Sequence, residues 1–62
     1  MKYYKREIQF CSTATGSLTE TEYWLDIALL NKYITKGEYD DLEDICMQIK
    51  KLLVIYVRGL LQ

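Results

Sequence analysis

Basic side chains gather in two parts of this 62-residue chain, and they have the clearest potential for chemistry. Tyr3 and Tyr4 lie among the first group, and aromatic rings beside cations are typical of surfaces that stack bases and contact phosphates. A solvated surface that keeps the chain soluble is the competing interpretation, and a net charge of −1 gives no general attraction to polyanions. The candidate nucleic-acid contacts are Lys2, Lys5, Arg6, Lys50, Lys51 and Arg58.

Five of the nine acidic side chains form a dense cluster between residues 38 and 44, and another, Glu22, falls inside an apolar pattern. Helical carboxylate metal sites pair glutamate with histidine, and the chain contains no histidine. We therefore interpret the cluster as a solvated surface that suits the start of a helix. Glu22 is interpreted as a structural carboxylate bonded to a tyrosine or a basic group, with a catalytic or metal role as the alternative.

The sequence contains no recognisable catalytic arrangement. A Gly-rich phosphate loop, a Cys-x-x-Cys pair and a nucleophile beside a base are all missing, so we expect no enzyme activity, no metal or other cofactor and no small-molecule substrate. Cys11 and Cys46 lie far apart on apolar helix faces, which predicts buried free thiols in a reducing compartment. No signal peptide and no membrane-spanning run are recognisable, so we expect a cytoplasmic protein without membrane contact.

The residues above are positioned by two predicted helices and the hinge between them. Thr35 and Glu38 have the spacing of a capping box, which marks the start of a helix at Lys36. Asn31 can take the left-handed conformation that ends a helix, which places the end of the first helix near Leu30. A connection this short makes the two helices antiparallel neighbours. The prediction is an all-α antiparallel hairpin with helices at about 3–30 and 36–61, forming a single domain over residues 1–62.

Apolar residues repeat at alternating steps of three and four in both helices, which is the spacing of a heptad seam. We expect these two seams to pack against each other. The first seam runs over Tyr4, Ile8, Cys11, Thr15, Leu18, Glu22, Leu25 and Leu29. The second runs over Tyr39, Leu42, Cys46, Ile49, Leu53, Tyr56 and Leu60.

A second stripe in the first helix, from Phe10 to Ala28, has small residues at its middle. Small side chains let another helix approach, so Ala14, Gly16 and Ser17 are predicted to mark a close helix packing. Two alternatives stay open at Gly16: a tolerated weakness or mild kink, and a break of the helix between residues 12 and 17.

The second half of the second helix is apolar nearly all round, and half of all residues are hydrophobic. Two helices alone cannot cover this much apolar surface. The sequence therefore predicts self-association of the hairpin into a four-helix bundle or a larger helical ring. The expected oligomer interface consists of Ile45, Ile49, Leu52, Leu53, Ile55, Tyr56 and Leu60.

Three segments carry a resemblance to a known family: Gly16–Ala28, Tyr33–Thr35 and Glu38–Leu42. They resemble the second half of the four-helix-bundle proteins linked to intervening sequences in bacterial 23S ribosomal RNA. This family includes the accessory proteins of diversity-generating retroelements. Its third helix contains a Gly-Ser-Leu-x-Glu segment, which is followed by a Tyr-Ile-Ser/Thr turn and an acidic start to the last helix. The present chain resembles the last two helices alone, the C-terminal half of the bundle.

The resemblance implies a homo-oligomer, because members of the family assemble, often as rings. It also implies a connection with RNA or DNA. We therefore expect a non-enzymatic structural or protein-interaction module. The alternative is a nucleic-acid-binding accessory protein that uses the basic open end of the oligomer.

Overall fold

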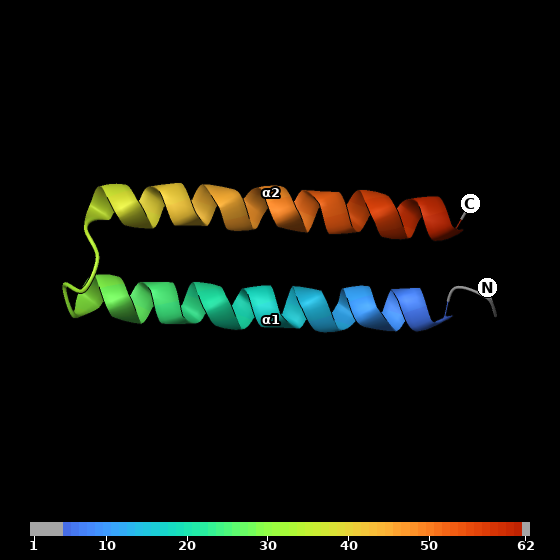
Figure 1. Cartoon of the computed structure of the whole chain (residues 1–62), viewed down its shortest axis with the longest axis horizontal. Coiled ribbons are helices and arrows are strands. Elements are labelled where there is room, and N and C mark those ends of the chain that lie inside the picture. Colours follow the sequence, from blue (N-terminus) through green and yellow to red (C-terminus); the bar gives the residue numbers. More distant parts are fainter. Residues whose placement is uncertain (1–4, 62) are drawn as a thin grey trace.

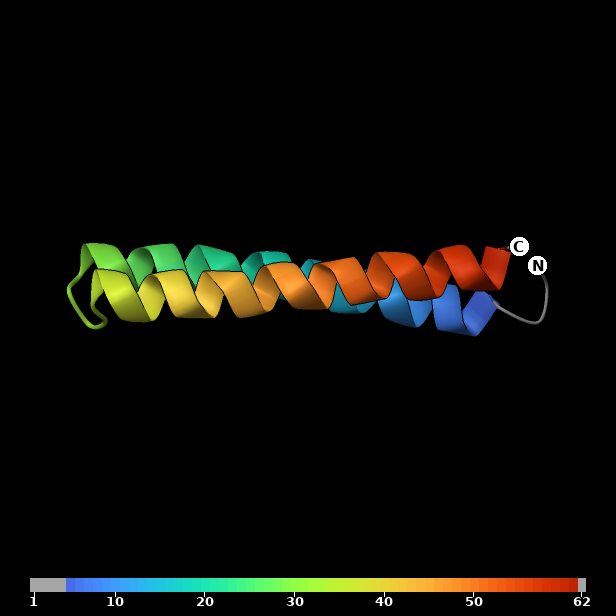
Figure 2. The same cartoon turned by 90° about the horizontal axis from the view of Figure 1, so that it is seen from above.

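The computed structural model of the chain describes residues 5–61 and consists of two long helices joined by a short hinge. Helix α1 (Lys5–Leu30) and helix α2 (Lys36–Leu61) run antiparallel side by side, and they cross at a shallow angle when seen from above (Figures 1 and 2). The Cα atoms span 46 × 15 × 8 Å. The predicted helical hairpin is confirmed, with both inner helix ends where the sequence placed them, whereas the predicted start at residue 3 lies outside the described residues.

Helix α2 begins with the capping box that the sequence predicts. The Thr35 backbone N–H donates to Glu38 Oε1 at 2.9 Å, and the Glu38 N–H donates to Thr35 Oγ1 at 3.1 Å. Each side chain thus satisfies a backbone donor that has no partner within the helix. Donation from the Thr35 backbone N–H to the Glu38 carboxylate, followed by donation from the Thr35 hydroxyl, lowers the pKa of the Glu38 carboxyl. The carboxylate therefore stays charged, and the cap stays closed, at pH values below the usual pKa of glutamate.

Helix α1 ends in a Schellman motif whose left-handed residue is Lys32, with a φ of 61°. The Lys32 N–H donates to Leu29 O at 3.1 Å and the Tyr33 N–H donates to Ala28 O at 2.9 Å, which closes the last turn. The sequence-based choice of Asn31 for this conformation was wrong by one residue. The Asn31 N–H and Nδ2 both donate to Ile27 O, so Asn31 still continues the helix.

Replacing Lys32 by glycine is expected to stabilise the hairpin by about 1 kcal/mol, because a side chain in the left-handed region costs roughly that much. For a chain of this size the thermal midpoint should rise by about 4–8 °C. Asn31→Gly is the matched control, since Asn31 does not have a positive φ and its N–H still makes a helix-type bond to Ile27 O, so glycine there should lower the midpoint. A midpoint that falls in both variants would contradict the assignment of the motif.

The seam between the helices is narrow and is centred on two cysteines. Cys11 and Cys46 are 5% and 6% exposed and both are free thiols, as predicted. Helix α1 faces α2 largely with its predicted seam, although Thr15 is exposed. No other residue between positions 5 and 61 is fully buried. The half-buried members of the α1 seam are Ile8, Leu18, Glu22, Leu25 and Leu29.

Helix α2 is turned relative to the prediction. Leu42, Ile49 and Tyr56 are 39%, 40% and 52% exposed, so their place in the predicted seam is wrong. The rotation brings Lys50 opposite Glu22, which gives a carboxylate inside the seam a charged partner. The residues that α2 turns toward α1 are Tyr39, Glu43, Cys46, Lys50, Leu53, Val57 and Leu60.

Candidate interaction surface

An apolar row lies beside the seam on each helix, and the α2 row is exposed because α2 is turned relative to the prediction. In both rows the residues follow one another at steps of three or four, so each row occupies one side of its helix. The α1 row consists of Phe10, Ala14, Ser17, Thr21, Trp24 and Ala28. The α2 row consists of Leu42, Ile45, Ile49, Leu52 and Tyr56. We call these eleven residues the apolar face.

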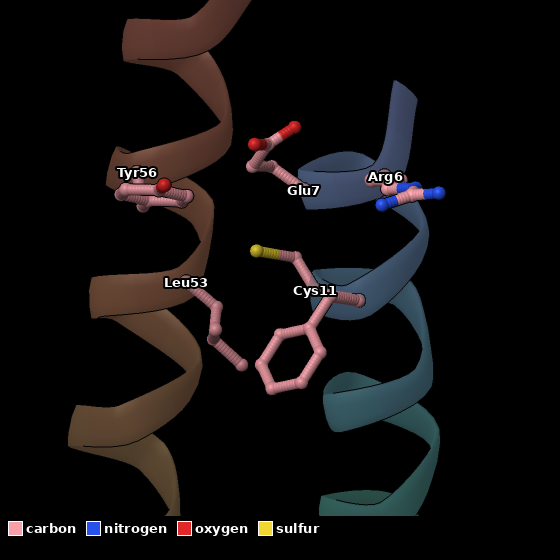
Figure 3. A pocket seen from close by; sticks show the side chains of 6 residues that line it. Arg6, Glu7, Cys11, Leu53 and Tyr56 are labelled. Atoms are coloured by element: carbon pink, nitrogen blue, oxygen red, sulfur yellow. The ribbon is translucent and has the colours of Figure 1, made fainter. Parts of the chain in front are cut away.

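Both rows border the same groove between the helices. This groove, of about 410 Å³, is lined at the open end of the hairpin by Phe10 of the first row and Tyr56 of the second. Figure 3 shows Leu53 and Tyr56 on one side of it, and Glu7 and Cys11 on the other. Because the helices are antiparallel, rows that meet at one end of the groove continue along the same face to the other end.

None of the eleven residues of the apolar face is charged, and the charged residues that line the same groove at the open end are Arg6 and Glu7. Its large members are well exposed: Phe10 is 75%, Trp24 57% and Leu52 65% accessible. The Thr21 hydroxyl donates to Ser17 O at 2.9 Å, so this polar group has a partner within its own helix. Large contiguous apolar surfaces are often interaction sites, so the apolar face is the candidate site of this hairpin.

The opposite side of the hairpin has a different character. Its groove is lined by Ile8, Ser12 and Thr15 from α1 and by Val54, Val57 and Arg58 from α2. Next to it, a shallow depression on α2 combines apolar side chains with three cations. That depression is lined by Met47, Lys50, Lys51, Val54, Ile55 and Arg58.

The predicted oligomer interface is divided by the structure into three groups. Leu53 and Leu60 are half-buried in the seam between α1 and α2. Ile55, 64% exposed, lies on the charged side of α2, away from the apolar face. The remaining predicted residues, which lie on the apolar face, are Ile45, Ile49, Leu52 and Tyr56.

Sequence reasoning did not include Phe10, Trp24 or Leu42 among the interface residues. The signal for the first two was present, because the stripe from Phe10 to Ala28 was recognised as a second contact line of the first helix. Leu42 was missed because it was assigned to the inner seam. Its 39% exposure follows from the turned orientation of α2.

Glu22 pairs with Lys50 across the seam, which agrees with its interpretation as a structural carboxylate with a basic partner. The side chains are 26% and 37% exposed, respectively. The hydrogen bond to Glu22 is the main cause that raises the pKa of Lys50 above its usual value. An ammonium held in this way is less available for a phosphate than a free one, which weakens Lys50 as a candidate nucleic-acid contact.

The other basic candidates stand at the open end of the hairpin. Lys5, Arg6, Lys51 and Arg58 are exposed, whereas Lys2 lies outside the described residues. Arg58 does not pair with Glu7 of α1: within residues 5–61 the ion pairs are Lys36–Asp40 and Lys50–Glu22. Glu7 Oε2 is instead buried at the edge of the groove, without a hydrogen-bond partner in the described part of the chain.

Near the hinge, the Tyr39 hydroxyl donates to Asp26 Oδ1 at 2.5 Å. This bond, with smaller effects of burial and nearby carboxylates, raises the pKa of Tyr39 to about 12. The folded state therefore favours the neutral phenol. Its contribution to stability should be fully present below the usual tyrosine pKa of about 10 and should be lost as the pH rises through about 12.

We expect an ultraviolet titration of phenolate absorbance to contain a late step near pH 12 that disappears in Tyr39→Phe. Asp26→Asn should move that step toward lower pH, because the amide removes the negative charge that opposes ionisation. Tyr33→Phe is the matched control, since Tyr33 is also at the hinge and 81% exposed. A late step that survives in Tyr39→Phe would contradict the assignment.

Gly16 lies on the outer side of α1, and α2 does not approach it. A Cβ added there would meet nothing within 4 Å. Helix α1 continues from Lys5 to Leu30, so a break between residues 12 and 17 is wrong. The close helix packing predicted at Ala14, Gly16 and Ser17 does not involve α2 at Gly16, and it stays a prediction about a helix of another chain.

Across residues 5–61, no three acidic or cysteine side chains come close enough together to hold a metal ion. Neither α1 nor α2, over the part that the structure describes, combines the length and the apolar character needed to cross a membrane.

Comparison with known proteins gives one match. A family model described as "23S rRNA-intervening sequence protein" matches residues 1–54. The match includes α1, the hinge and most of α2, and it contains all three segments that carry the resemblance noted in the sequence. Neither the curated proteins nor the solved structures give a match.

Proposed function

Because the chain belongs to the 23S rRNA-intervening sequence protein family, we propose that it is a non-enzymatic module that works by self-association of its helical hairpin. The observation that carries this proposal is the apolar face. Eleven residues without a charge extend along both helices, while only Cys11 and Cys46 are buried within the described hairpin. A second copy of the chain is a partner that is always present and could cover this face.

The dimensions of the hairpin are compatible with this role. The Cα atoms of the whole hairpin have an outline of 46 by 15 Å, about 690 Å², so a contact over most of one side would approach the roughly 800 Å² that each partner contributes to a standard stable interface. Two hairpins packed through this face would form a four-helix arrangement with the apolar rows at its centre. The charged opposite sides would then face water.

Sedimentation equilibrium of the unmodified chain at micromolar concentration tests the proposal. We expect the mass of a dimer or a larger closed oligomer rather than the 7.4 kDa of one chain. A well-folded species with the mass of a single chain would overturn it. The mass of a dimer would favour a rebuilt four-helix bundle over a larger ring.

A nucleic-acid-binding accessory role is the second candidate, and it is favoured by the distribution of charge. The open half of the hairpin, residues 5–17 and 49–61, holds five basic side chains and one acidic side chain. RNA or DNA held by these groups should dissociate steeply as salt is added, with a slope set by the number of phosphates contacted. Filter binding with a structured RNA at several salt concentrations measures this, and no retention at low salt would exclude the role.

The free, buried cysteines are consistent with a reducing cytoplasmic location for this module. No cofactor or small-molecule substrate is part of the proposal.

A further inference from the structure

The hairpin is electrically polar from one end to the other. The hinge half, residues 18–48, holds eight acidic and two basic side chains, a formal net charge of −6. The described part of the open half holds one acidic and five basic side chains, a formal net charge of +4. Because the two helix dipoles are antiparallel and nearly cancel, this end-to-end difference comes from the side chains.

Two copies can pack through the apolar face in two symmetric ways. If the twofold axis runs along the hairpin, both hinges lie at the same end, and like charges are brought together at each end. If the axis crosses the hairpin, the hinge of one copy lies beside the open end of the other, and opposite charges meet. Facing helices pack about 8–10 Å apart, within the Debye length of about 10 Å at 0.1 M salt, so screening does not remove this difference.

The apolar rows match the second arrangement. Each helix has 26 residues, which places Ser17 and Ile49 close to the two midpoints. In the α1 row, the large Phe10 and Trp24 are equally distant from Ser17. In the α2 row, Leu42 and Tyr56 are equally distant from Ile49. The large residues of both rows are therefore placed symmetrically about the middle and come level with each other when a second copy is reversed, whereas Ala28 at the hinge end of the α1 row has no counterpart.

We propose that the apolar face binds a second copy of the chain in the reversed orientation, with the twofold axis passing near Ser17 and Ile49. This inference rests on the proposed self-association and adds its geometry. Helix α1 packs against α1 of the second copy and α2 against α2. Phe10 then lies level with Trp24 of the second copy, and Leu42 lies level with Tyr56 of the second copy.

The reversed arrangement also explains the small residues in the middle of the α1 row. Ala14, Ser17 and Thr21 would lie around the twofold axis, where the two α1 helices cross. Small side chains at a crossing let the helix backbones come close. The larger residues toward both ends of the rows fill the wider space where the helices diverge.

A distance between the two hinges tests the orientation. We would attach a spin label to Tyr33→Cys, since Tyr33 is 81% exposed at the hinge, and measure the separation by pulsed electron resonance on the full chain. The reversed dimer should give a separation close to the 46 Å length of the hairpin. The same-end dimer should give about 10–20 Å, set by the spacing of packed helices. The unsubstituted chain, whose two cysteines are buried, supplies the background.

These outcomes separate the two proposals. A dimer with a short hinge-to-hinge distance would overturn the reversed orientation and leave self-association intact. If sedimentation gives the mass of a single chain and the spin labels show no defined separation, both the self-association and the reversed orientation are overturned. A dimer with the long distance supports both.

Cross-linking through an engineered cysteine at the axis gives a second measurement. Ser17→Cys should form a covalent dimer on mild oxidation, because the two copies of this residue face each other across the axis. Ser12→Cys is the matched control, since Ser12 lines the groove on the opposite side of the hairpin and should remain uncoupled. Equal coupling of the two variants, or coupling of Ser12→Cys alone, would overturn the proposed face.

Discussion

Replacing Leu52 by lysine is expected to raise the dissociation constant of the dimer by at least about 100-fold, which corresponds to roughly 3 kcal/mol. Leu52 is 65% exposed on the apolar face, so the substitution costs little within one hairpin. In the dimer the ammonium would be buried among apolar side chains without a partner, and symmetry introduces two such charges per dimer. Sedimentation equilibrium at several loading concentrations measures the change.

Ile55→Lys is the matched control, because Ile55 has nearly the same exposure, 64%, on the same helix. It lies beside Lys51 and Arg58 in the depression on the charged side, where another cation stays in water. We expect this variant to assemble like the unmodified chain. If Ile55→Lys dissociates the oligomer and Leu52→Lys does not, the interface lies on the charged side of the hairpin and the proposed apolar face is contradicted.

The fold was predictable from the sequence because its determinants are local. The heptad spacing gave both helices, and the reciprocal bonds of Thr35 and Glu38 fixed the start of α2. The end of α1 was also correct, although the left-handed position fell on Lys32. Propensity favours asparagine there, but the Asn31 N–H and its side-chain amide both donate to Ile27 O, which moves the left-handed position one residue further along the chain.

The rotation of α2 could not be read from the sequence. Leu42, Ile49 and Tyr56 offer a fully apolar seam, whereas the observed orientation places Glu43, Lys50 and Val57 beside the inner residues. The apolar repeat of one helix does not report on charges of the other helix. It therefore could not show that Glu22 in the α1 seam pairs with Lys50 of α2. This rotation also changes the candidate site, because Leu42, Ile49 and Tyr56 lie outside the seam and form part of the apolar face.

The two candidate functions compete for the same end of the hairpin. In the reversed dimer, each basic open end lies beside the acidic hinge of the second copy, which reduces the attraction of that end for phosphates. In a same-end dimer or a ring of hairpins, the basic ends would reinforce one another. The hinge-to-hinge distance therefore bears on nucleic-acid binding as well as on assembly, and a short distance would strengthen the second candidate.

Stability should depend strongly on protein concentration, because the hairpin alone has little core. Within residues 5–61 only Cys11 and Cys46 are buried, and a single chain has one contact line between its helices. For a dimer that unfolds in one step, with an unfolding enthalpy of about 0.7 kcal/mol per residue, the thermal midpoint should rise by roughly 5 °C for each tenfold increase in concentration. Circular dichroism at 222 nm across a dilution series measures this.

Trp24 provides an independent signal in the same series. It is the only tryptophan of the chain and lies on the apolar face, 57% exposed in the single hairpin. Its emission should shift to longer wavelength on dilution, in parallel with the loss of helix signal, as the face becomes accessible to water. The Leu52→Lys variant should show a lower midpoint that does not change with concentration, since a monomer unfolds independently of concentration. If the unmodified chain also keeps a constant midpoint and constant emission over roughly a hundredfold dilution, the hairpin is stable with its apolar face bare.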